Sequence, residues 1–331
     1  MKWSLLPPLA LSATSVQAIL RFSCSQLVVE RLDPLVNPGQ LPSPHTHQIV
    51  GGNAFNVTMD QDIPSTATCT TCTFSEDFSN YWTASVYFQA RNGSFRRVKQ
   101  IGNVGFEQAT AGMTVYYTAT ISGKSSVTAF KKGFRMLVGD PSFRTAAQAK
   151  KYRQLTYTCL QTAMTRSGET VAFPAKPCPA GLMVNTRFPT CWDGVNLDSA
   201  DHQSHVAYPT SGTFESGGPC PATHPVKVPQ VFYEAVFDTR PFNDPSLWPA
   251  DGSQPFVWSF GDKTGYGNHG DYVFGWKGDA LQRAMDANCN VNCPTLKTQS
   301  IAAGNKCSKR MTVNEEVDGW LEKLPGGMEV N

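Results

Sequence analysis

Ten cysteines constrain the fold of this 331-residue chain more than any other feature of its sequence. All of them follow residues 1–18, which have the features of a secretory signal peptide: Lys2, a short apolar run, and small residues near Ala18. An even number of cysteines in a secreted protein predicts disulfide bonds rather than metal thiolates. Cys69 and Cys72 form a lone CxxC pair without a thioredoxin-like pattern around it, so we expect both to be structural.

Other features also indicate a secreted protein, either extracellular or associated with a cell wall. Two sequons, at Asn56 and Asn92, predict N-glycosylation in exposed loops. The apolar run of the signal peptide is shorter than the roughly 20 residues needed to cross a bilayer, and no later segment is apolar for that length. The net charge of +2 and the lack of a strong basic cluster argue against nucleic-acid binding.

Residues 19–331 are expected to form a single β-rich extracellular domain. Alternating large and small side chains and turn residues predict strands, whereas helical spacing of apolar residues occurs mainly in 278–286. Residues 178–220 are irregular and contain three cysteines, which is typical of a functional or disulfide-pinned loop. We therefore predict a mainly β fold, an antiparallel sandwich or jelly roll with long disulfide-pinned loops and few short helices. The expected strands include residues 26–34, 81–90, 95–98, 114–120, 133–140, 228–238 and 255–260.

Histidine and aspartate gather in three short segments, 45–47, 201–205 and 269–271. If residues 45–47 are extended, the side chains of His45 and His47 share one face, because side chains alternate along a strand. The candidate catalytic residues are these histidines and nearby aspartates: His45, His47, Asp193, Asp201, His202, His205, His269 and Asp271.

One interpretation of these segments is a site for zinc or a similar divalent metal. Imidazole nitrogens and carboxylate oxygens are the ligands that such ions use, and a bound ion would polarise water or a substrate oxygen. The candidate ligands are His45, His47, His202 and His205. HxH alone is a weak signal, and the HExxH helix of metalloproteases is absent. A copper centre built on an N-terminal histidine is disfavoured, since the predicted mature chain begins at Ile19.

A second interpretation needs no metal, because histidine exchanges protons near neutral pH and an aspartate fixes its tautomer. A lyase acting on a uronic-acid polysaccharide would use a His or Tyr base and a cation, whereas a glycosidase would use two carboxylates. The carboxylate candidates are Asp193, Asp198, Asp201, Asp262 and Asp271, and the candidate substrate-binding residues are Trp192, Arg187, Tyr208 and Tyr266. The same aspartates and histidines also suit a purely structural role in turns.

Five motifs, in the same order along the chain, resemble one known family. They are Leu27-Val28-Val29-Glu30-Arg31-Leu32-Asp33-Pro34, His45-Thr46-His47-Gln48-Ile49-Val50-Gly51-Gly52, Trp192-Asp193-Gly194, Asp201-His202-Gln203-Ser204-His205-Val206-Ala207-Tyr208-Pro209 and Gly267-Asn268-His269-Gly270-Asp271. The chain is similar to the fungal secreted domain-of-unknown-function family numbered nineteen ninety-six. The resemblance implies a fungal extracellular protein of a family sometimes joined to wall-binding modules, and it implies no particular reaction.

The leading hypothesis is a secreted fungal enzyme that acts on a cell-wall or other polysaccharide, as a hydrolase or a lyase, through a His/Asp site. The alternatives are a non-catalytic wall-associated or carbohydrate-binding protein, and a metal-binding protein without turnover. Clustering of ionisable side chains in Gly-rich loops on a β scaffold favours the first, because functional sites commonly occupy such loops.

Overall fold

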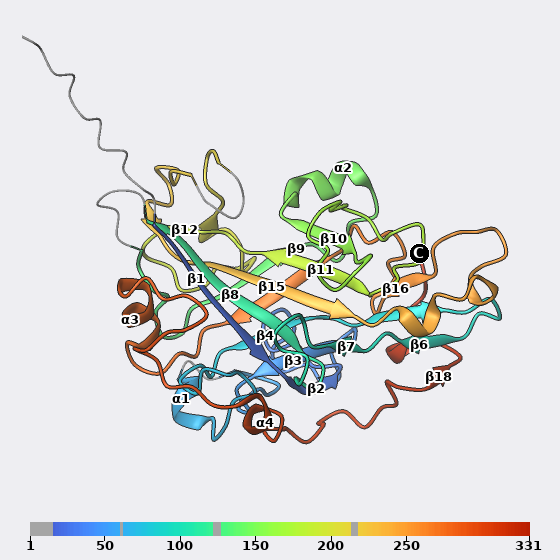
Figure 1. The fold of residues 1–331 in the computed structure, drawn as a ribbon, viewed down its shortest axis with the longest axis horizontal. Helices are drawn as coiled ribbons and strands as arrows, with labels where there is room; N and C mark the ends of the chain where they lie inside the picture. The colour runs from blue at the N-terminus through green and yellow to red at the C-terminus, as the bar shows by residue number, and fades with distance from the viewer. Residues whose placement is uncertain (1–15, 60–61, 122–126, 213–217) are drawn as a thin grey trace, which may run out of the picture.

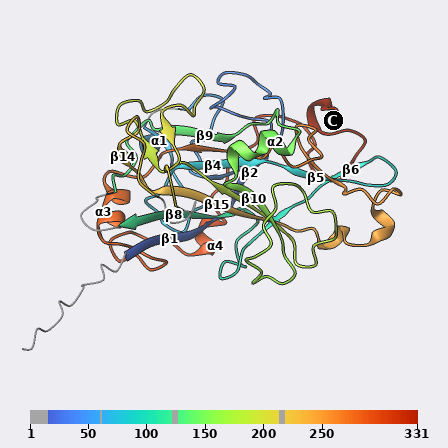
Figure 2. The ribbon, with the colours of Figure 1, turned by 90° about the horizontal axis from the view of Figure 1, so that it is seen from above.

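Two antiparallel sheets, packed face to face, form the centre of the molecule in this computed structural model (Figures 1 and 2). The structure describes residues 16–59, 62–121, 127–212 and 218–331. Of the predicted signal peptide, residues 1–15 lie outside the described residues, and residues 16–18 begin the first strand, β1. Seen from above in Figure 2, β9, β4 and β2 lie along one layer, whereas β15, β8 and β1 lie along the other.

The first layer is a six-stranded sheet with the order β1-β8-β15-β11-β10, to which the short strand β7 adds by pairing with β15. Its strands are β1 (Val16–Cys24), β8 (Met113–Ile121), β15 (Gln230–Phe237), β11 (Leu182–Arg187), β10 (Leu155–Cys159) and β7 (Gln100–Ile101).

The second layer is a five-stranded sheet with the order β2-β3-β4-β17-β9. Its strands are β2 (Gln26–Glu30), β3 (His47–Gly51), β4 (Asn80–Ala84), β17 (His269–Val273) and β9 (Arg135–Gly139). The inner face of this sheet covers the six-stranded sheet. Its outer face carries Val28, Ile49, Trp82, Leu137 and Val273, which form a second apolar cluster under the loops of residues 31–70.

Two smaller antiparallel sheets and short helices complete the described structure. One sheet contains β16 (Phe256–Trp258), β5 (Val86–Gln89), β6 (Phe95–Arg97) and β18 (Trp320–Leu321), and the other contains β13 (Val206–Ala207), β12 (Cys191–Trp192) and β14 (Val226–Lys227). The α-helices are α1 (Ile63–Thr66), α2 (Ala146–Ala149), α3 (Ala280–Asp286) and α4 (Ile301–Gly304). Single 3-10 turns occupy Lys150–Tyr152, Arg240–Phe242, Pro245–Leu247 and Pro325–Gly327.

The mainly β, antiparallel prediction is confirmed, and so is the single stronger helix near residue 280. The strand predicted over residues 81–90 is wrong in one respect, because it is two strands, β4 and β5, in different sheets. Ser85 separates them. Its amide donates to the Thr46 carbonyl and its carbonyl accepts from the Ser259 amide, so the chain passes from one sheet to the next here.

All ten cysteines are paired in five disulfides, as the even count predicts. The CxxC cysteines belong to different bonds, Cys24–Cys72 and Cys69–Cys307, so they form no redox pair. The other bonds are Cys159–Cys178, Cys191–Cys220 and Cys289–Cys293. Cys191–Cys220 closes residues 191–220 of the segment predicted to be irregular over 178–220, but that prediction is wrong for Leu182–Arg187, which forms β11 within the six-stranded sheet.

A chain of buried hydroxyl groups crosses the interface between the two large sheets. Tyr117 of β8 meets Tyr81 of β4 at 2.8 Å and Tyr272 of β17 at 2.9 Å, and Tyr81 donates to the Asp77 carboxylate at 2.6 Å. Burial raises the pKa of Asp77 to about 7, although hydrogen bonds from Tyr81 and Ser79 oppose the shift. Buried polar groups need hydrogen-bond partners, and these hydroxyl groups provide them for one another and for Asp77 within an aromatic core.

We predict that Asp77→Asn removes a pH dependence of stability. The carboxyl group has a pKa of about 7 when folded against an ordinary value of 3.8, so the folded state binds more protons between these values. The free energy of unfolding of the wild type therefore falls as the pH rises through this window, by up to a few kcal/mol. Thermal unfolding from about pH 4 to about pH 8 should show a smaller fall for the variant; parallel falls in both proteins would contradict the assignment.

Candidate metal centre

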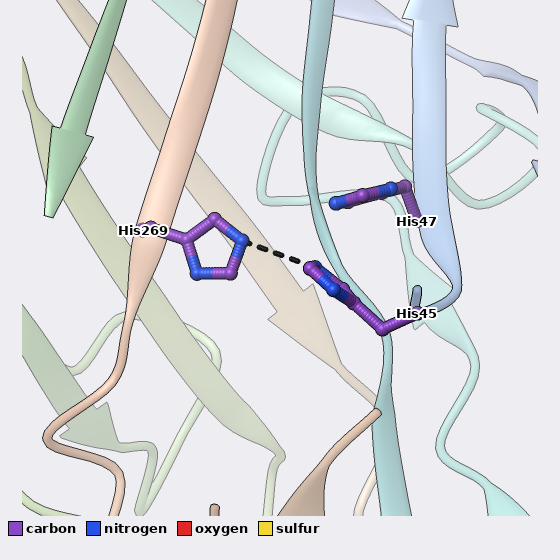
Figure 3. A group of neighbouring side chains, drawn as sticks. All are labelled: His45, His47 and His269. Atoms are coloured by element: carbon purple, nitrogen blue, oxygen red, sulfur yellow. Dashed lines mark hydrogen bonds between the residues drawn. The ribbon is translucent and has the colours of Figure 1, made fainter. Parts of the chain in front are cut away.

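Three imidazoles meet on the outer face of the five-stranded sheet, and Figure 3 shows them converging. His47 is the first residue of β3, His269 is the first residue of β17, and His45 lies in the loop just before β3. All three are buried, with exposed fractions of 8% or less. One nitrogen from each ring lies within 4.8 Å of the others. His45 and His47 lie close together, as predicted, although His45 lies in a bend before β3 and not in an extended strand.

The register of the sheet explains why residues 222 positions apart meet. His47 lies opposite Ala84 of β4, and Gly270 of β17 lies opposite the neighbouring Thr83. His47, Ala84 and His269 therefore form one row across three strands, with their side chains on the same face. The small side chain of Ala84 leaves room between the two rings, whose centroids are 6.2 Å apart.

Gly139 of β9 completes this row on the other side of His269. Its φ is +93°, which favours glycine, and a Cβ built there would lie 2.2 Å from the Asn268 carbonyl oxygen and 2.7 Å from the His269 Cα. The absence of a side chain at this position lets β9 approach the start of β17 closely and so fixes the position of His269.

Backbone carbonyls fix the tautomers of two of the rings. His47 Nδ1 lies 3.1 Å from the Leu32 carbonyl and His269 Nδ1 lies 3.0 Å from the Gly267 carbonyl. A carbonyl only accepts, so each Nδ1 carries the proton and each Nε2 presents a lone pair. Such a bond from the far nitrogen to a carbonyl is typical of metal-binding histidines.

The three rings present nitrogens toward one another, and His45 and His269 are hydrogen-bonded through theirs: His269 Nε2 accepts, so His45 Nε2 donates. His47 Nε2 is buried without a hydrogen-bond partner among the described residues, and His45 Nε2 lies 3.3 Å from His269 Nε2. Burial lowers the pKa of His47 to about 3 and that of His269 to about 4, and burial together with the neighbouring histidines lowers the pKa of His45. The three rings are therefore neutral at neutral pH, which is the form that binds metals.

Asp262 positions the carbonyl that holds His269. Its two carboxylate oxygens accept from the amides of Thr264 and Gly267, at 2.7 and 2.8 Å. This arrangement shapes the Gly-rich loop before β17. Asp262, one of the candidate carboxylates, thus acts in this structure as a buried turn residue beside the cluster.

A cavity of about 430 Å³ opens beside the cluster, within the usual range for small-molecule sites. His45 and His269 line it, together with Asp33, Leu137, Arg144 and Phe260. The Phe260 ring packs 5.2 Å from His45 and 5.1 Å from His269, and the Arg144 guanidinium lies 5.8 Å from the same ring. Two of the three imidazoles therefore border a space that a substrate group could occupy.

A larger cavity, of about 550 Å³, is lined by Lys131, Lys132 and Trp276 among others, and no histidine borders it. Size alone would favour this larger cavity as the functional site. Ligand chemistry favours the smaller one, because metal-binding and proton-transfer groups gather there. Another group of potential ligands, Cys24, Cys72 and Asp77, offers no thiolates because its cysteines form a disulfide.

The Asp201–His205 segment lies outside the three-histidine cluster and binds the edge of the sheet instead. His202 O accepts from the amide of Leu137, and His205 Nε2 donates to the carbonyl of Arg135, both on the edge strand β9. Gln203 Nε2 adds a bond to the Gly139 carbonyl. The loop thereby satisfies backbone groups of an edge strand that would otherwise need another partner.

Hydrogen bonds inside this loop occupy its aspartates and histidines. Asp198 Oδ1 lies 2.7 Å from His202 Nδ1, and Asp201 Oδ1 accepts from the amides of Gln203 and Ser204. His205 Nδ1 lies 2.9 Å from the Ser199 hydroxyl. His202 has a φ of +56°, an uncommon conformation for a side-chain-bearing residue.

The remaining candidates have structural partners. Asp193 accepts from the amides of Val195 and Asn196, and the Trp192 indole donates to the Asn196 carbonyl. Arg187 is buried against Glu169, and Tyr208 donates to the Arg187 carbonyl. Tyr266 is half-buried in the loop before β17, whereas Asn56 and Asn92 are exposed, as glycan acceptors require. These candidate residues do not line the cavity beside the histidines.

Asp33 is a cavity residue that the sequence interpretation did not include. It begins a turn at Asp33-Pro34, where its Oδ1 accepts from the amides of Leu35 and Val36 at 3.1 Å. The Asp33-Pro34 pair is evident in the sequence, but an aspartate before a proline is adequately explained by a turn. Phe260 and Arg144 carried no comparable signal.

The comparisons with known proteins establish the family. A family model described as a domain of unknown function (DUF1996) matches residues 33–276. The chain belongs to this family. The matched range contains Asp33, all three clustered histidines and the Asp201–His205 loop. No curated protein and no solved structure matches the chain. Within the described residues, no helix has the length and apolar character needed to cross a membrane.

We predict that Asp201→Ala destabilises the fold and leaves metal binding unchanged. Asp201 accepts hydrogen bonds from two backbone amides, as a helix N-cap residue does. By analogy with helix caps, its replacement by alanine should lower the free energy of unfolding by about 1 kcal/mol. Denaturant unfolding would measure the change, and metal content would be determined on the same sample. A large loss of metal with no loss of stability would show that the loop belongs to the metal centre.

Proposed function

We propose that the chain is a secreted protein whose His45–His47–His269 cluster binds a divalent metal such as zinc and acts on an extracellular polysaccharide. The proposal rests chiefly on the convergence of three buried, neutral imidazoles, one nitrogen of each lying within 4.8 Å of the others. His47 Nε2 has no partner among the described residues, and the Nε2 atoms of His45 and His269 are hydrogen-bonded only to each other. Three protein ligands with an open position are the pattern of catalytic zinc sites, whereas structural sites use four.

The cavity supports a catalytic role for the metal rather than a structural one. A metal held by the three Nε2 atoms would lower the pKa of bound water or polarise a substrate oxygen. His45 and His269 border the cavity, so the open position would face it. Phe260 provides an apolar wall on which a sugar ring could pack, and Arg144 provides a positive charge for an acidic substituent.

The five disulfides support an oxidising compartment, and the predicted signal peptide supports secretion. The exposed sequons at Asn56 and Asn92 suit a glycoprotein. The resemblance of the motifs supports a fungal origin. A polysaccharide substrate agrees with that setting, and both hydrolysis and elimination are compatible with a metal beside the cavity.

We predict that protein purified without chelator contains about one equivalent of divalent metal, and that His47→Ala and His269→Ala lose it. Each variant removes one of three ligands, which weakens binding strongly. The matched control is His224→Ala, because His224 lies outside the cluster and bonds to Ser204 and Thr223. Elemental analysis after dialysis gives the metal content, and a metal-free wild type would contradict the proposal.

We further predict that the metal-loaded wild type depolymerises at least one member of a broad panel of neutral and acidic polysaccharides. His269→Ala should lose this activity, and His224→Ala should retain it. New reducing ends identify hydrolysis, whereas absorbance of an unsaturated product identifies elimination. Metal binding without cleavage of any panel member would favour metal capture without turnover, and glycan binding without either would favour a carbohydrate-binding protein.

A further inference from the structure

Asp271 is a fully buried carboxyl group, and neither of its oxygens has a hydrogen-bond partner among the described residues. It follows His269 by two positions on β17, so both side chains lie on the outer face of the sheet. An unpartnered carboxyl group in an apolar environment is costly and rare. Its position beside the histidine cluster suggests that its missing partner is an ion or molecule that binds at that cluster.

Two other polar atoms without partners lie on the same face. Trp82 of β4 is directly opposite Asp271, and its indole Nε1 has no acceptor among the described residues. His47 Nε2 is the other. Three kinds of polar group on this face therefore lack partners among the described residues: the indole donor of Trp82, the carboxyl oxygens of Asp271 and the lone pair of His47 Nε2. They lie in neighbouring rows of the adjacent strands β3, β4 and β17.

Asp33 contributes a second carboxylate from the loop that covers this face. It is 3% exposed and lines the cavity with His45 and His269. Burial raises the pKa of both carboxyl groups, the charge on Asp33 raises the pKa of Asp271 further, and His269 lowers the pKa of Asp33, so the two carboxyl groups and His269 interact electrostatically. Only one of its oxygens, Oδ1, is used in capping the turn.

We propose that Asp271 and Asp33 are outer-shell carboxylates that balance the charge of a divalent cation held by His45, His47 and His269. Three neutral imidazoles bring no negative charge, and a buried dication without counter-charge is strongly disfavoured. Ionised beside a bound dication, the two carboxylates would supply a charge of −2. The pair therefore sets both the affinity of the centre and its preference for a dication over a monocation. This inference rests on the proposed metal centre.

The test compares Asp271→Asn with the wild type in calorimetric titrations with Zn²⁺ and with Ag⁺. Removal of an outer-shell partner commonly weakens metal binding by 10- to 100-fold, so we expect a loss of about 30-fold for Zn²⁺. Coulomb energy is proportional to the charge of the ion, so the loss for Ag⁺ should be near the square root of that value, about 5-fold. Asp33→Asn keeps the turn acceptor Oδ1 and should likewise lower the affinity for Zn²⁺ more than the affinity for Ag⁺.

Asp77→Asn is the matched control, since Asp77 is another fully buried carboxyl group but lies among the tyrosines at the sheet interface. It should leave both affinities unchanged. Thermal unfolding without metal checks that each variant folds, and Asp33→Asn carries the test if Asp271→Asn does not fold. If the wild type binds no zinc, the proposed function fails. If it binds zinc and the variants bind equally well, or lose both ions by the same factor, the charge-balancing role is overturned.

Discussion

The register of β3, β4 and β17 is the constraint on which the histidine cluster depends. It places His47, Ala84 and His269 in one row. The small side chain of Ala84 leaves room for the His269 ring, and Gly139, on the other side, lets β9 approach the His269 backbone. A shift of one residue would send His47 or His269 to the opposite face, because side chains alternate. On the inner side of this sheet, the hydroxyl groups of Tyr81, Tyr117 and Tyr272 link it to the six-stranded sheet.

The loops add what the strands cannot supply. The segment before β3 brings His45 and Asp33 over the outer face, and the Leu32 carbonyl orients His47. The loop before β17, shaped by Asp262, provides the carbonyl that orients His269. Both rings are thus held by Nδ1, with Nε2 turned toward the other histidines. Such preorganisation favours metal binding, since little rearrangement remains to be made.

The sequence predicted the local features well and the long-range ones poorly. Alternation identified the β strands, the cysteine count predicted disulfides, and the spacing of His45 and His47 indicated a shared face. The meeting of His47 with His269 depends on strand pairing across 222 positions, which no local pattern encodes. The Asp201–His205 loop looked equally suited to a site, because turn-forming and ligand-forming aspartates are the same residue type. Asp33 was missed for the converse reason, since its turn already explained it.

The most direct test of the central claim is a crystal structure of zinc-soaked protein, with diffraction data collected on both sides of the zinc absorption edge. We expect one strong anomalous peak within bonding distance, about 2.0–2.1 Å, of Nε2 of His45, His47 and His269. A peak only at the Asp198–His202 pair, or no peak at a zinc concentration that saturates binding in solution, would contradict it.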